Sequence, residues 1–170
     1  NWPPVDRDPS FAMLDDVAEC QRLLREDVVD RVLKRDVTAL FGVRNVNELE
    51  RLFLYICLHS GGQLNVQSCA EQLGANRTTV NNHLDLLVRA HLLYRLPPDA
   101  AGGKKLLKSQ NKYYLTDAAL RNAILLSGEE VLQDAQEAGI IVETAVLRHL
   151  YASYYADTPR FSYWRDAASG

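Results

Sequence analysis

A polar face of four side chains is the feature of this sequence most suited to chemistry. Arg77, Thr78, Asn81 and Asn82 fall on one side of a predicted helix, and their guanidinium, hydroxyl and amide groups can hydrogen-bond to base edges or phosphates. A second group consists of four lysines that can contact phosphates without reading sequence: Lys104, Lys105, Lys108 and Lys112. These eight residues are the predicted nucleic-acid-binding site. An alternative for the lysines is that they discourage edge-to-edge strand pairing.

No catalytic arrangement accompanies this face. The histidines show no H-E-x-x-H spacing, no Ser or Cys lies in a G-x-S-x-G context, and the cysteines show no C-x-x-C spacing. The run Gly102-Gly103-Lys104 lacks the upstream glycine and the hydroxyl of a phosphate-binding loop. We therefore expect no catalytic residue, no metal, no cofactor and no binding of ATP.

The elements that would position the polar face follow a helix-turn-helix pattern over residues 64–87. Ala70 stands where two helices must approach closely, and Gly74 stands where the chain must turn. Asn65 and Asn76 can cap the two helices. Many such helix pairs are packing units that bind no nucleic acid, so the motif predicts geometry more directly than function.

The flanking segments extend this pattern to a winged helix over residues 46–116. A preceding helix is predicted over 48–59 with Asn45 or Asn47 as its cap, and strands are predicted over 91–96 and within 104–115. We expect this helix to supply most of the core. The two strands would form the wing.

Charge is concentrated in the same region. The chain has 19 Lys and Arg against 22 Asp and Glu, a net charge of -3. Residues 64–116 carry seven basic and three acidic residues, a local balance of +4, whereas the flanking segments come to -3 and -4. Attraction to a polyanion is therefore expected to be local.

The composition is that of a soluble globular chain of 170 residues, 47% of them hydrophobic. Cys20, Cys57 and Cys69 lie within helical apolar patterns, which predicts reduced cysteines and a cytoplasmic protein. No apolar run is long enough for a membrane span, and the first ten residues lack the features of a signal peptide.

The two outer segments differ from the centre. Residues 1–45 predict an N-terminal helical segment, with two helices or one long bent helix over 11–41. Residues 117–170 predict a short helix to about Leu126, an apolar helix over 140–151 or beyond after Gly139, and a strand at 161–165. A lone terminal strand suggests a truncated α/β unit, and hence a piece of a longer protein.

Five sequence runs together resemble the C-terminal region of a family of prokaryotic AAA-type ATPases. They are KRDVTALFGVRN (34–45), GGQLNVQSCAEQLGANRTTVNNHLDLL (61–87), KSQNKYYLTDAAL (108–120), GIIVETAVLRHL (139–150) and YWRD (163–166). The resemblance implies an ATPase module, absent here, followed by a winged helix and a restriction-endonuclease-like α/β domain. Glu143 matches a metal-holding glutamate of such nuclease domains, but the strands bearing its partner carboxylates are missing, which favours an ordinary exposed or helix-packing carboxylate.

These observations predict a mainly α chain: a winged helix-turn-helix with N-terminal helices and a truncated, endonuclease-like α/β unit. The expected function is a non-catalytic module of an AAA-type ATPase. Its partners would be DNA and the ATPase module of the same longer chain, and no membrane. The alternative is an interaction or regulatory scaffold that docks the ATPase core or another protein and binds no nucleic acid. The sequence does not indicate an oligomeric state.

Overall fold

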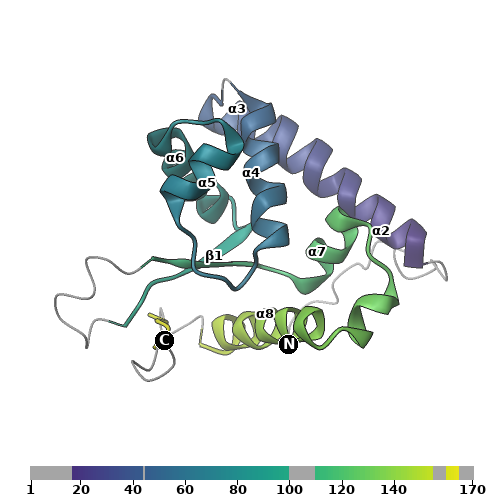
Figure 1. The fold of residues 1–170 in the computed structure, drawn as a ribbon. Coiled ribbons are helices and arrows are strands. Elements are labelled where there is room, and N and C mark those ends of the chain that lie inside the picture. Colours follow the sequence, from purple (N-terminus) through teal and green to yellow (C-terminus); the bar gives the residue numbers. More distant parts are fainter. Residues whose placement is uncertain (1–16, 44, 100–109, 155–159, 165–170) are drawn as a thin grey trace, which may run out of the picture.

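The computed structural model describes residues 17–43, 45–99, 110–154 and 160–164, and this part of the chain is mainly helical. A small antiparallel pair of strands accompanies the helices (Figure 1). The prediction of a mainly α chain is therefore confirmed. None of the helices in these residues is both long enough and apolar enough to cross a membrane.

The N-terminal segment is one continuous helical stretch rather than two helices. It comprises α2 (Val17–Arg25), the π-helical η1 (Glu26–Val37) and α3 (Thr38–Phe41), and it ends at Gly42, whose φ of 62° is left-handed. Its predicted start, at residue 10 or 11, lies outside the described residues. Apolar side chains along one side of the stretch are buried against the rest of the core. The long helix thus covers the outside of the helices that follow it (Figure 1).

Three helices form the centre of the molecule: α4 (Val46–Leu58), α5 (Val66–Leu73) and α6 (Arg77–Arg89). The side chains of Asn45, Asn65 and Asn76 each accept a hydrogen bond from a backbone N–H in the first turn of these helices. The caps at Asn65 and Asn76 were predicted, and Asn45 was one of the two candidates for the cap of α4. Gly74, with a φ of 64°, ends α5 and allows the turn into α6. Ala70 is buried in the same core, so the small-residue pattern corresponds to close packing.

The strands β1 (Leu93–Leu96) and β2 (Lys112–Leu115) pair in antiparallel register, with Leu93 opposite Leu115. Both are shorter than predicted, and residues 104–109 of the second predicted strand lie outside the described residues. On the other edge of β2, Gln63 forms a single antiparallel bridge to Lys112. The loop between α4 and α5 is thereby fixed to the sheet.

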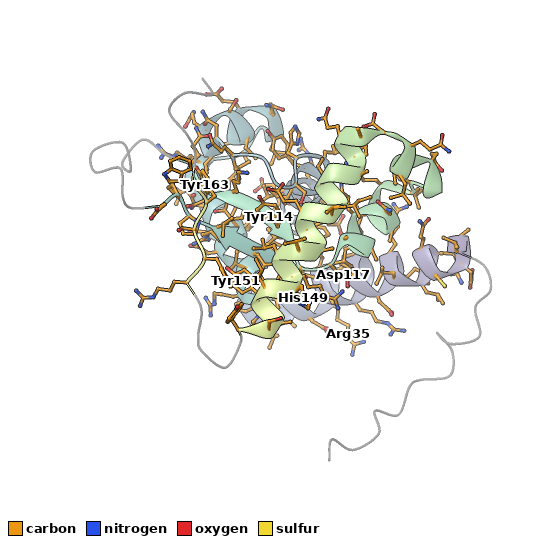
Figure 2. The ribbon with its side chains drawn as sticks, turned by 90° about the horizontal axis from the view of Figure 1, so that it is seen from below. Arg35, Tyr114, Asp117, His149, Tyr151 and Tyr163 are labelled. Carbon is orange, nitrogen blue, oxygen red and sulfur yellow. The ribbon has the colours of Figure 1, made fainter. Side chains whose placement is uncertain are left out.

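The strand pair has a hydrophobic cluster on each face. Leu93, Tyr113 and Leu115 belong to the main core with α4, α5 and α6. Leu96 and Tyr114 belong to a second, smaller cluster that also contains Leu147 of α8, the helix Ala135–Ser153. Because neighbouring side chains of a strand point to opposite faces, this sheet is covered on both sides (Figures 1 and 2).

The C-terminal helices differ from their prediction at one boundary. α7 (Ala118–Leu125) is capped by Asp117 and is followed by the 3₁₀ turn η3 (Glu129–Gln133). α8 begins at residue 135, before the predicted start after Gly139, because Asp134 accepts hydrogen bonds from two N–H groups of its first turn. Such a cap contributes about 1 kcal/mol, similar to the cost of a glycine inside a helix. Gly139 is therefore tolerated within α8.

The predicted strand at 161–165 is reduced, within the described residues 160–164, to one parallel bridge between Tyr163 and Pro98. The Tyr163 N–H donates to the Pro97 carbonyl over 2.9 Å, and the Asp99 N–H donates to the Tyr163 carbonyl over 2.8 Å. Pro97 and Pro98 have no backbone N–H, so this segment has fewer donors for a longer ladder. The described part of 117–170 consists of two α-helices, the 3₁₀ turn η3 and one bridge.

Candidate nucleic-acid interface

The exposed side of α6 carries the four side chains predicted to read nucleic acid. Arg77, Thr78, Asn81 and Asn82 are all exposed, and the opposite side of the helix is buried through Val80, Leu84 and Leu87. The Asn76 cap holds the first turn by accepting a hydrogen bond from the Thr78 N–H over 2.8 Å. The helix therefore presents its N-terminal half to solvent as a polar surface.

These four side chains have no partner among the described residues. No hydrogen bond or ion pair within that part of the chain involves the guanidinium of Arg77, the hydroxyl of Thr78 or the amides of Asn81 and Asn82. Amide and guanidinium groups that are exposed and unpaired can turn to meet a ligand without first breaking a contact. We name these four residues the α6 polar face.

The other charged groups near α6 are engaged within the molecule. Asp85 forms an ion pair with Arg95 of β1, and the guanidinium of Arg89 lies 4.9 Å from the ring centroid of Phe41. Asp85 would repel a phosphate, but its pairing with Arg95 reduces that repulsion. Arg77 is left as the basic group of the α6 polar face.

Of the four predicted wing lysines, Lys112 is the one that lies within the described residues. Lys104, Lys105 and Lys108 lie outside the described residues. The strand alternation puts Lys112 on the same face of the sheet as Tyr114. Tyr114 belongs to the cluster with Leu147 of α8, on the side opposite to the main core, and Figure 2 shows it beside that helix. Sequence reasoning grouped Lys112 with its neighbouring lysines because it did not foresee a helix on that side.

Lys112 belongs instead to a polar contact that fixes α8 to the sheet. Its Nζ donates to the Tyr114 hydroxyl over 3.4 Å and lies 3.8 Å from a carboxylate oxygen of Glu143. The Tyr114 hydroxyl in turn donates to Glu143 over 2.9 Å. Burial raises the pKa of Tyr114, and the hydrogen bond to the Glu143 carboxylate raises that pKa further. Glu143 therefore acts as a packing group of α8, one of the two alternatives that the sequence favoured.

No metal site forms around Glu143 or elsewhere in the part of the chain that the structure describes, where no three His, Cys, Asp or Glu side chains gather. His83, on α6, is half-buried. Burial lowers the pKa of its imidazole, and the nearby Glu48 opposes this effect. A helix-packing role fits this half-buried environment.

Arg121 is a buried charge that sequence reasoning missed. Its side chain is only 5% exposed; its Nε donates to the Cys57 carbonyl over 3.0 Å, and its guanidinium forms an ion pair with Glu137. The interactions join α4, α7 and α8 at one point. The sequence did contain a sign of this burial. Arg121 is the one charged residue in the run 118–126, whose other residues are apolar apart from one asparagine.

Residues 10–130 match the model of a family described as a domain of unknown function, DUF8612. The chain belongs to this family. The match includes the helices α2 to α7 and the strand pair, and it ends before α8.

A relative from Haemophilus influenzae, described as an uncharacterized protein, is 26% identical over 149 residues. The aligned region covers 85% of this chain and 36% of the relative, so the chain spans little more than a third of that protein's length. No solved structure matches the chain.

Proposed function

We propose that residues 46–116 act as a winged-helix module that binds duplex DNA, with α6 as the helix that enters the major groove. The order of elements supports this, because three helices followed by an antiparallel strand pair is the arrangement in which α6 would be the recognition helix. The observation that carries the proposal is the exposed and unpartnered α6 polar face. Asparagine can pair with adenine and arginine with guanine in that groove.

The charge distribution favours weak, salt-dependent binding. Arg95 and Lys112 are paired with carboxylates inside the molecule, which leaves Arg77 and the lysines of residues 104–108 as the proposed phosphate or base contacts. The chain as a whole carries a net charge of -3. Counterion release from a few phosphates would then supply most of the binding free energy.

The module would belong to a longer protein. The sequence resemblance supports an AAA-type ATPase as that protein, and the greater length of the Haemophilus relative leaves room for an ATPase module in such proteins. In this proposal the present chain is non-catalytic, resides in the cytoplasm and transmits or receives the action of the ATPase. An endonuclease-like domain after residue 170 is part of the same proposal.

Fluorescence anisotropy tests DNA binding directly. A labelled duplex is titrated with the chain at low and moderate salt, and Arg77→Ala is compared with Arg25→Ala. Arg25 is also exposed but lies on α2, at the other end of the molecule from α6 (Figure 1). We expect Arg77→Ala to weaken binding by about 10-fold, the effect of one good contact, and Arg25→Ala to have little effect. Equal affinities for all three proteins, or no binding to duplex at micromolar protein, would contradict the proposal.

A second candidate function is a protein-interaction scaffold. Val142 and Val146 of α8 are 60% and 53% exposed, and Leu132 of η3 is 60% exposed. Exposed aliphatic side chains at helical spacing are typical of surfaces that contact another protein. In this alternative the helices α5 and α6 serve only as architecture, and the ATPase core or another protein covers α8. Substituting Val142 and Val146 with serine would weaken partner binding and leave any DNA binding unchanged.

A further inference from the structure

A pocket beside the first residue of β2 is separate from the α6 polar face. Its volume is about 410 Å³, within the range of about 300–1,000 Å³ that is usual for small-molecule sites. The lining residues come from the loop after α4, from β2 and from the last described residues of the chain: Gly61, Gly62, Gln63, Lys112, Tyr163 and Trp164. Figure 2 shows Tyr163 at this end of the molecule. The pocket therefore combines one cation, one amide and two aromatic rings.

The aromatic side chains of the pocket differ in how firmly they are held. The Tyr163 hydroxyl donates to the Gln110 carbonyl over 2.6 Å and accepts from the Gln63 amide over 3.1 Å, so this ring is fixed. The neighbouring Trp164 is 70% exposed. An exposed tryptophan beside a pocket offers a large planar surface on which a flat ligand can stack. The fixed ring of Tyr163 lines the same pocket.

The cation of the pocket lies close to the fixed ring. Lys112 Nζ is 5.4 Å from the Tyr163 ring centroid, and its side chain is 24% exposed. An ammonium group has three donors, and here one is directed to the Tyr114 hydroxyl and a second faces Glu143 at 3.8 Å. One donor is left for an anionic ligand. The neighbouring carboxylate limits the site to a ligand of low charge.

The two glycines of the pocket do not add further anion donors. The Gly61 N–H donates to the Tyr113 carbonyl over 2.9 Å, and the Gly62 N–H donates to the His59 carbonyl over 3.1 Å. The glycines therefore do not form a cradle for a polyphosphate. Their lack of side chains instead keeps the space open, since a Cβ at Gly61 would lie 3.0 Å from a Glu143 oxygen and 3.1 Å from the Tyr114 ring.

We propose that this pocket binds one nucleotide unit, with its base stacked on Trp164 and its single phosphate on Lys112. Among the described residues the Gln63 amide contacts only Tyr163, through one N–H, which leaves its oxygen and its second N–H for a base edge. A planar group, one negative charge and a hydrogen-bonding edge are together the chemistry of a nucleotide. The unit could come from a single strand or from a free mononucleotide. Single strands are commonly held by this combination of aromatic stacking and a basic side chain.

Intrinsic tryptophan fluorescence tests the pocket. The chain has two tryptophans, so a Trp2→Phe background makes Trp164 the single reporter. This protein is titrated with oligothymidylate of about 12 nucleotides, with thymidine monophosphate, and with a duplex of the same length. We expect saturable quenching by the single strand or the mononucleotide, because a stacked base quenches indole emission. Tighter binding of the oligomer would assign the pocket to a strand, and equal affinity would assign it to a free nucleotide.

Three variants separate this site from the α6 polar face. Binding of a labelled single strand is measured by anisotropy, and folding is checked by circular dichroism. We expect Trp164→Ala and Lys112→Gln each to weaken single-strand or mononucleotide binding by about 10-fold, and Arg77→Ala to leave it unchanged. Trp164 is exposed, so its removal leaves the fold intact even if Lys112→Gln disturbs the sheet. Absence of saturable quenching by both ligands, or unchanged binding by Trp164→Ala, would overturn the proposal.

Discussion

The two faces of the strand pair treat their polar groups in opposite ways. On the side of the main core, α6 buries its apolar face and presents Arg77, Asn81 and Asn82 to solvent, without partners among the residues that the structure describes. On the other side, Lys112 and Glu143 satisfy each other and the Tyr114 hydroxyl between the sheet and α8. Polar groups that are paired within the molecule stabilise packing, whereas exposed and unpaired groups cost little to transfer to a ligand.

This difference separates residues that sequence alone would group together. Lys112 and Arg77 are both basic and both lie in the +4 segment, but only Arg77 lies on a face without internal partners. Substitutions on the α8 side are therefore expected to change stability, or binding at the pocket that Lys112 lines, and to leave duplex binding unchanged. The α6 side is expected to respond mainly through binding.

The largest effect is expected from Arg121, which joins α8 to the helices of the core. In Arg121→Met, the Cys57 carbonyl and the Glu137 carboxylate lose their partner, while the side-chain volume is nearly kept. We expect the free energy of unfolding to fall by about 3 kcal/mol, the lower end for breaking a buried pair, because Glu137 is one-third exposed. Urea denaturation measures this change. Arg148→Met, which removes the exposed pair to Asp117, is the matched control and should cost less than about 1 kcal/mol.

The next largest effect is expected for duplex binding when the wing lysines are removed. Replacing Lys104, Lys105 and Lys108 with alanine removes three positive charges from residues outside the described structure. If they contact phosphates, the slope of the logarithm of affinity against the logarithm of salt concentration should fall by about 3 in magnitude. Anisotropy at several salt concentrations measures the slope. An unchanged slope would mean that these lysines serve only to prevent edge pairing.

A smaller effect is expected from the hydroxyl of Tyr114. Tyr114→Phe removes the hydrogen bond to Glu143, whose side chain is about half exposed and can be hydrated instead. We expect a loss of about 1 kcal/mol in the free energy of unfolding at neutral pH, with α8 still in place.

The same substitution should change how stability depends on pH. The pKa of Tyr114 is raised in the folded protein above its ordinary value of 10.0, so the folded state holds its proton at a pH where the unfolded chain loses it. The stabilisation is complete below pH 10 and is lost as pH rises beyond it. Denaturation between pH 9 and 11, bracketing that value, should therefore show a shallower decline for Tyr114→Phe than for the wild type. Parallel declines would show that Tyr114 ionises as freely when folded as when unfolded.

Much of the local structure could be predicted because its causes are local. The caps at Asn65 and Asn76 and the turn at Gly74 depend on side chains and backbone angles within a few residues. The orientation of Lys112 and the burial of Arg121 could not be predicted in the same way, because both depend on α8, which is distant in sequence. The α6 polar face was predictable from helical periodicity, whereas the pocket was not, since it needs residues near 61, 112 and 163.

The smallest expected effects give the sharpest test of the comparison. Lys112→Ala removes the same charge as a substitution of Lys104, Lys105 or Lys108. It should nevertheless leave duplex affinity unchanged, because the ammonium group of Lys112 faces Glu143 on the α8 side. Asn81→Ala should weaken duplex binding only slightly in total, but the loss should be larger for a preferred sequence than for a random one, because an amide reads base edges rather than phosphates. Anisotropy competition between the two duplexes measures both variants. If Lys112→Ala weakened duplex binding as much as a wing-lysine substitution, the two faces would not be separate, and the duplex would have to extend across the sheet to the α8 side.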